Sequence, residues 1–99
     1  MRNALEEDPL VSGVVAWSDG FAAGAMQYLY EIGRKVPEDI EIIGHDDTLA
    51  YMLAPPISSI QMPFEEMASS AISIISENKD DPSGAITKTV SLEPRLIIR

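Results

Sequence analysis

Two short apolar runs separated by a segment with helical periodicity constrain this chain more than any other feature. The first run, Val11–Trp17, suits a strand of a parallel sheet that is covered on both faces. A second β-branched run follows at Ile40–Gly44, and between the two runs apolar positions recur every three or four residues from Gly20 to Ile32. The order strand, helix, strand is typical of a right-handed crossover unit. The sequence therefore predicts an α/β fold with a parallel sheet.

The ends of the central helix are marked by residues with known positional preferences. Ser18 or Asp19 can cap its N-terminus by accepting hydrogen bonds from the free amides of the first turn. Gly33 supplies the left-handed conformation that commonly ends a helix, and Arg34 with Lys35 lies near the negative end of the helix dipole. We expect this helix to be the best defined element of the chain.

The segments on either side of this unit predict shorter elements. Met1–Glu7 matches the last turns of a helix that Asp8 and Pro9 close, because the residue before a proline disfavours the helical region. Asp46-Asp47-Thr48 is positioned to cap a short helix through Met52, and Ile57–Ile60 is a brief extended segment.

The C-terminal third predicts one more helix and two extended segments. Pro63 suits the first turn of a helix, and apolar residues at helical spacing predict a buried stripe on it. The residues of that stripe are Phe64, Met67, Ala68, Ala71, Ile72 and Ile75. Thr87–Leu92 and Arg95–Ile98 are expected to be extended, with an interruption at Pro94, which a sheet interior would not accept.

Composition narrows the functional class. The 99 residues, 45% of them hydrophobic, suit one soluble domain with one core. There is no cysteine, and neither a signal peptide nor an apolar run long enough for a bilayer is apparent, so we expect a cytoplasmic protein without membrane contact. Sixteen acidic against seven basic residues give a formal charge of -9, which disfavours direct binding to DNA.

Polar clusters follow both predicted strands and form the candidate binding site. Trp17-Ser18-Asp19 follows the first strand and His45-Asp46-Asp47 the second, and ligands of open α/β sheets bind beyond the carboxyl ends of strands. A carboxylate accepts hydrogen bonds from adjacent hydroxyls while an indole covers the apolar face of a sugar ring, so this is carbohydrate-binding chemistry. The plainer interpretation is structural, since Asp19 and Asp46 also suit helix caps and Trp17 also suits the core or a pocket wall.

Catalysis and metal binding are disfavoured. His45 beside two aspartates has the residue types of a metal or proton-transfer site, but it is the only histidine of the chain. Phosphate loops, nucleophile elbows and zinc spacings are missing from the sequence, so we predict neither an enzyme, nor a metal site, nor a cofactor. An alternative from another class is a receiver-like domain that binds magnesium or accepts a phosphoryl group at Asp19, Asp46 and Asp47.

The order of several short motifs resembles the C-terminal third of the lactose/galactose repressor (LacI/GalR) family of transcriptional regulators. The resemblance extends across almost all of residues 11–98 and rests on Ala16-Trp17-Ser18-Asp19, Ala22-Ala23-Gly24-Ala25-Met26, Val36-Pro37-Glu38-Asp39-Ile40, Ile43-Gly44-His45-Asp46-Asp47, Pro55-Pro56-Ile57-Ser58-Ser59-Ile60 and Glu93-Pro94-Arg95-Leu96. It implies a three-layer αβα, periplasmic-binding-protein-like (type I) fold, of which residues 1–99 form a C-terminal fragment. Residues 11–54 would belong to the C-terminal lobe, 57–78 to a crossover and helix of the N-terminal lobe, and 86–99 to a return.

The resemblance also implies roles for individual residues. Asp46 matches the aspartate that contacts the effector, and Ser18 with Asp19 matches the polar pair at the pocket edge, beside Trp17. Two helical segments, 21–32 and 50–53, match the surfaces through which the family dimerises. The residues implied for this dimer interface are Phe21, Ala22, Ala25, Met26, Leu29, Tyr51 and Leu53.

On this basis we expect an effector-sensing and dimerisation segment of a repressor whose partners are a small molecule, such as a carbohydrate, and a second copy of the chain. The DNA-binding headpiece of the family has no counterpart in these 99 residues, so DNA would be bound only through a separate headpiece. A further alternative is a truncated module that associates with itself through uncovered apolar faces and strand edges and binds no ligand.

Overall fold

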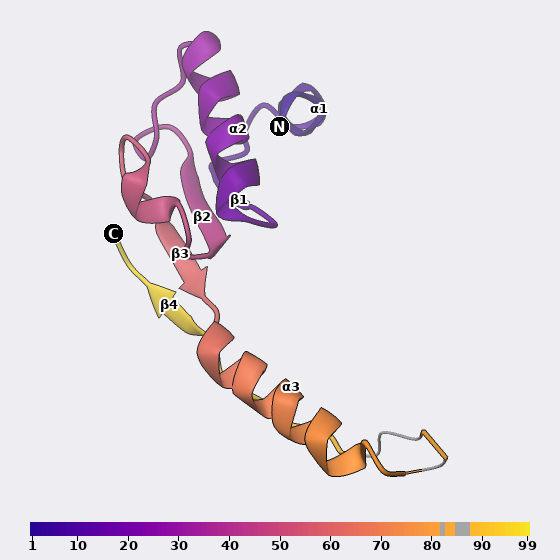
Figure 1. The fold of residues 1–99 in the computed structure, drawn as a ribbon. Helices are drawn as coiled ribbons and strands as arrows, with labels where there is room; N and C mark the ends of the chain where they lie inside the picture. The colour runs from indigo at the N-terminus through magenta and orange to yellow at the C-terminus, as the bar shows by residue number, and fades with distance from the viewer. Residues whose placement is uncertain (82, 85–87) are drawn as a thin grey trace. The chain divides into compact units, whose positions relative to one another are not determined.

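A computed structural model describes residues 1–81, 83–84 and 88–99 of the chain (Figure 1). Its contacts divide the chain into two units, residues 1–61 with 95–99 and residues 62–94, which are described separately. The first unit contains α1 (Arg2–Glu7), β1 (Gly13–Val15), α2 (Asp19–Glu31), β2 (Glu41–Asp46), the 3₁₀ helix η1 (Ala50–Met52), β3 (Ser58–Gln61) and β4 (Arg95–Ile97). The second contains α3 (Phe64–Asn78).

The four strands form one sheet in the order β1-β2-β3-β4. The pairs β1–β2 and β2–β3 are parallel, with Val15 opposite Ile43 and Ile43 opposite Ser58. The last pair, β3–β4, is antiparallel and brings Gln61 opposite Arg95. This mostly parallel sheet with helices confirms the α/β prediction.

The central helix α2 begins and ends as the sequence predicts. The Ser18 hydroxyl accepts a hydrogen bond from the Phe21 amide and is the N-terminal cap. At the other end Gly33 adopts a φ of 76°, and its amide donates to the Tyr30 carbonyl while the Arg34 amide donates to the Leu29 carbonyl. These two bonds are the Schellman pair that satisfies free carbonyls at a helix end.

The core lies between α2 and one face of the sheet. Ala22, Met26 and Leu29 of α2 are buried, together with Ile42 of β2 and Ile40 just before it. Complete burial of a side chain such as Leu29 contributes about 1.5–3 kcal/mol. This apolar face of α2 therefore anchors the helix to the sheet.

The opposite face of the sheet is open at β1, within the part of the chain that the structure describes. Side chains alternate along a strand, so Val14 and Ala16 point toward the core while Val15 and Trp17 point away, with exposed fractions of 72% and 86%. The expectation that the Val11–Trp17 strand is covered on both faces is therefore met on one face only. The strand is also shorter than predicted because regular pairing spans only Gly13–Val15.

The second unit differs from expectation in two respects. The apolar stripe of α3 is exposed where burial was predicted, because no other helix or strand is described in residues 62–94 to pack against it. The stripe residues, all exposed, are Phe64, Met67, Ala68, Ala71, Ile72 and Ile75. Residues 88–94 form no strand, so the described part of the segment expected to be extended, 88–92, is not in the sheet. Residues 86 and 87 of the predicted return lie outside the described residues.

Ser58–Gln61 pairs with β2 in the first unit, and the chain leaves this unit after Gln61. None of the described helices has both the length and the apolar character needed to cross a bilayer.

Candidate functional site

The carboxyl ends of β1 and β2 lie side by side and form the candidate site. Because Val15 pairs with Ile43 in parallel register, the residues that follow each strand emerge at the same edge of the sheet. An open depression of about 440 Å³ lies there, lined by Val15, Ala16, Trp17, His45 and Asp46. The structure thus brings together two of the predicted site residues, Trp17 and Asp46, and adds His45 to the lining.

The side chains of the depression combine apolar and charged groups. The Trp17 indole is largely exposed, and the Asp46 carboxylate is about one third exposed, at 32%. His45 Nδ1 lies 2.8 Å from Asp46 Oδ1, so the imidazole orients the carboxylate. An exposed indole face beside an oriented carboxylate suits a ring with one apolar face and adjacent hydroxyl groups.

Ser18 is near this edge but has a different role. Its hydroxyl caps α2, with Ser18 Oγ 3.3 Å from the Phe21 amide nitrogen. It lines a separate hollow on the side of α1 and α2, together with Gly20 and Phe21, and does not line the depression that contains Asp46.

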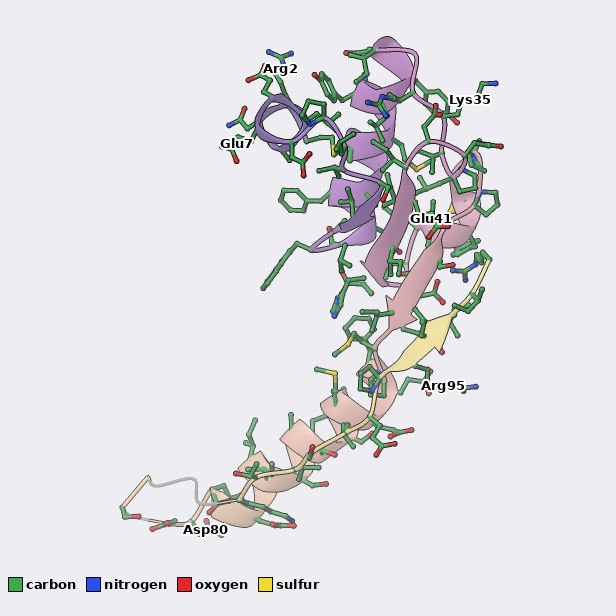
Figure 2. All side chains as sticks on the ribbon, turned by 180° about the vertical axis from the view of Figure 1, so that it is seen from behind. Arg2, Glu7, Lys35, Glu41, Asp80 and Arg95 are labelled. Carbon is green, nitrogen blue, oxygen red and sulfur yellow. The ribbon has the colours of Figure 1, made fainter. Side chains whose placement is uncertain are left out.

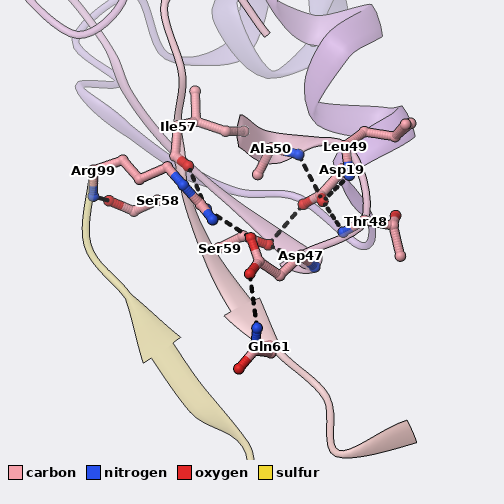
Figure 3. Close-up of polar contacts among 10 residues, drawn as sticks. All are labelled: Asp19, Asp47, Thr48, Leu49, Ala50, Ile57, Ser58, Ser59, Gln61 and Arg99. Atoms are coloured by element: carbon pink, nitrogen blue, oxygen red, sulfur yellow. Dashed lines mark hydrogen bonds and ion pairs between the residues drawn. The ribbon is translucent and has the colours of Figure 1, made fainter. Parts of the chain in front are cut away.

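Asp19 is buried, and its carboxylate is occupied by protein groups (Figure 3). Asp19 Oδ2 accepts hydrogen bonds from the amides of Thr48, Leu49 and Ala50 at 2.8, 2.9 and 3.0 Å. Asp19 Oδ1 accepts from Ser59 Oγ at 2.7 Å. Asp19 therefore does not cap α2, whose cap is Ser18, and its carboxylate is committed to the amides that open η1 and to Ser59.

The same network corrects the cap that the sequence predicts for the short helix. No side chain from the 46–48 segment caps η1, whose N-cap residue is Leu49. Asp46 and Asp47 instead have positive φ angles of 90° and 54°, in the left-handed region. The sequence does not reveal this capping group, because Asp19 is about 30 residues away from η1 in the chain. The two segments meet only because β1 and β2 are neighbours in the sheet.

The hydrogen bonds at Asp19 predict a pH dependence of stability. Burial raises the pKa of Asp19, but the hydrogen bonds from Ser59 and the three amides outweigh it and hold the pKa below the ordinary value of 3.8. A depressed pKa stabilises the fold above pH 3.8, and this contribution is lost as the pH falls through the folded-state pKa. We expect the difference in unfolding free energy between wild type and Asp19→Asn, measured by urea denaturation, to shrink from about pH 7 to about pH 3. A difference that stays constant with pH would contradict this assignment.

Asp47 is also occupied, by groups from β3 and from the chain after β4. Its Oδ1 lies 2.6 Å from Arg99 Nη1, and its Oδ2 accepts from Gln61 Nε2 at 3.1 Å. The hydrogen bond to Asp47 raises the pKa of the Arg99 guanidinium. Since Asp19 and Asp47 are both committed to protein partners, they do not form the open acidic pocket that a receiver-like magnesium or phosphoryl site requires.

The residues implied for a dimer interface separate into three groups. Three of them face the core and are unavailable to a second chain, which corrects that part of the prediction: Ala22, Met26 and Leu29. Ala25 and Leu53 are half-buried against the core. Phe21 and Tyr51 are exposed. The period of a helix predicts which residues share a face, but not whether that face meets the core or a partner.

Comparisons with known proteins agree with the fold. A family model described as a periplasmic binding protein-like domain matches residues 1–99. The ribose operon repressor of Haemophilus influenzae is 31% identical over 100 residues, which cover 100% of this chain and 30% of the repressor. The HTH-type transcriptional regulator CelR of Thermobifida fusca is 35% identical over 102 residues, with 100% of this chain and 29% of CelR covered. The chain thus spans about 30% of the length of the curated relatives it matches.

Solved structures with bound sugars are also similar. The complex of the transcriptional regulator CelR with cellobiose has a TM-score of 0.86 and 34% identity, and the match covers 99% of this chain and 30% of that one. A LacI family transcriptional regulator from Enterococcus faecalis V583 with bound ribose has a TM-score of 0.80 and 28% identity, covering 96% of this chain and 36% of that one.

Proposed function

Because this chain belongs to the periplasmic binding protein-like domain family and its relatives are LacI-family transcriptional regulators, we propose that its Trp17–His45–Asp46 edge is one wall of a carbohydrate effector pocket. The observation that carries the proposal is the open depression in which an exposed indole and an oriented carboxylate lie together. The similar structures with cellobiose and ribose, and that of a LacI family transcriptional regulator from Arthrobacter sp. FB24 in complex with lactose, support the ligand class.

The proposed mechanism is a shift between two arrangements of a larger regulator. A sugar held by this wall and by a second wall, supplied elsewhere in such a regulator, would favour the arrangement in which both walls contact it. Asp46 would accept hydrogen bonds from sugar hydroxyls, and Trp17 would cover the apolar face of the ring. The chain itself performs no chemistry in this proposal, and DNA is bound through a separate headpiece in the cytoplasm.

Two further parts of the proposal concern partners. Phe21 and Tyr51 are exposed apolar residues and support contact with a second copy of the chain. A second candidate function is a self-associating module without a ligand. It is favoured by the exposed face of the sheet at Val15 and by the exposed apolar stripe of α3. The two candidates differ in whether sugars perturb Trp17 and Asp46.

We expect the 99-residue chain to bind its sugar weakly, with a dissociation constant of about millimolar or higher, because one wall alone leaves most of a ligand exposed. Ribose, lactose and cellobiose are added separately, and amide and indole resonances are followed by ¹H–¹⁵N NMR. Shifts should concentrate at Trp17, His45 and Asp46. Asp46→Asn should weaken binding about tenfold, because it removes charge-assisted hydrogen bonds.

A matched control lies on the same strand. Glu41 is exposed at the opposite end of β2, so Glu41→Gln removes the same charge and should leave the titration unchanged (Figure 2). Micromolar sugar binding by this chain would contradict the proposal that it supplies only one of the two walls of the pocket. The absence of shifts at the depression with every sugar would favour the self-associating module.

A further inference from the structure

Asp47 follows Asp46 in the chain and is held from three directions. Its two carboxylate oxygens contact Arg99 and Gln61, and its amide donates to Ser59 Oγ at 3.2 Å (Figure 3). Its side chain is only 6% exposed. Desolvation offsets much of the attraction in a buried ion pair, so the main consequence of these contacts is geometric. They fix the residue next to the proposed effector contact against β3 and against the chain that follows β4.

The contact with Gln61 lies where the chain changes units. Gln61 is the last residue of β3 and of the first unit on the outgoing path, after which the chain enters residues 62–94. It pairs with Arg95, the first residue of the returning β4. Asp47 therefore contacts the sheet at the strand pair through which the chain leaves and re-enters the first unit.

The backbone around Asp47 leaves little freedom to absorb a displacement. Asp46 and Asp47 both have left-handed φ angles, which are disfavoured for residues with a Cβ and persist only where the surroundings hold them. The amides from Asp47 to Ala50 all donate to Asp19 or Ser59. Asp47, which directly follows Asp46, is thus held at its amide by Ser59 and at its carboxylate by Gln61 and Arg99.

We propose that Asp47 is a positioning residue that couples the effector wall at Asp46 to the Gln61–Arg95 strand pair. A sugar bound at Asp46 would then change the environment of Gln61 and Arg95, the two points where the chain crosses between its units. The ligand in this inference rests on the proposed function, whereas the coupling itself is present in the ligand-free chain. The two are therefore tested separately.

The ligand-free test is a double-mutant cycle of Asp47→Asn and Gln61→Leu. Its readout is the chemical shift of the Arg95 amide, measured by ¹H–¹⁵N NMR. Asparagine tolerates the left-handed region as aspartate does, so Asp47→Asn reports the lost side-chain contact and not a backbone preference. We expect Asp47→Asn alone to shift the Arg95 amide and the shift to fall by about half or more in the Gln61→Leu background. Additive effects would overturn the coupling.

The ligand test titrates wild type and Gln61→Leu with the same three sugars. Gln61 is exposed and lies outside the depression, so Trp17 should respond at concentrations within about twofold of wild type. The Arg95 response should fall in Gln61→Leu, whereas a purely structural defect would reduce both responses together. An unchanged Arg95 response would overturn the inference. If no sugar perturbs the depression, the proposed function fails and the ligand-free cycle decides the coupling alone.

Discussion

Asp19→Ala is expected to lower the free energy of unfolding by about 2–5 kcal/mol, because each buried donor left without its acceptor costs about 1–3 kcal/mol. The substitution removes the acceptor of three amide hydrogen bonds and of the Ser59 hydroxyl, and the bonds from Ala50 and Ser59 are buried. Buried donors without acceptors retain their full desolvation cost. A domain of this size has about 5–15 kcal/mol of stability in total, so the variant should be close to unfolding. Urea denaturation followed by circular dichroism measures the loss.

Two variants separate this network from a general effect of charge. Asp19→Asn keeps the shape and one acceptor oxygen, so we expect a smaller loss of about 1–2 kcal/mol. Asp80 is exposed in the turn after α3 (Figure 2), and Asp80→Ala should change stability by less than about 0.5 kcal/mol. Equal losses in Asp19→Ala and Asp80→Ala would show that the buried network contributes nothing specific.

Gly44→Ala should be destabilising by about 3 kcal/mol or more, beyond the usual range for overpacking, because the added methyl meets polar atoms that have no room to move. A Cβ at residue 44 would overlap Asp19 Oδ1 and approach Ser59 Oγ to 3.2 Å. Both atoms are already fixed by their mutual hydrogen bond of 2.7 Å. The absence of a side chain at Gly44 is therefore what allows the Asp19 carboxylate to pack against β2. The same denaturation experiment measures this effect.

The same substitution elsewhere in the chain is the control. Gly24 lies on the exposed face of α2, and a Cβ there would meet nothing within 4 Å. Gly24→Ala should therefore stabilise the chain by up to about 1 kcal/mol through helix propensity. In the double variant Asp19→Ala with Gly44→Ala, the cost should be clearly less than the sum, because truncation of Asp19 makes room for the methyl. Strict additivity would argue against direct contact between the two positions.

The candidate site was only partly predictable. Trp17 and Asp46 were identified because polar residues after parallel strands meet at one edge, and their meeting requires only that the strands be neighbours. The role of Asp19 was not predictable in this way. A carboxylate after a strand suits a cap or a ligand contact equally well, and its burial depends on which loop packs over it.

The sequence by itself determined the elements whose causes are local. The alternating α/β order follows from signals that each act within a few residues. These are the apolar periodicity of α2, the Ser18 cap, the left-handed Gly33 and the β-branched run of β2. Tertiary structure alone decided what those elements face. The bonds of Asp19 to η1 join the segments that follow β1 and β2, which are neighbours in the sheet. The bonds of Asp47 to Gln61 and Arg99 form because β3 lies between β2 and β4. The order of the strands is a long-range property that patterns of a few residues do not specify, so these contacts appear only in the folded chain.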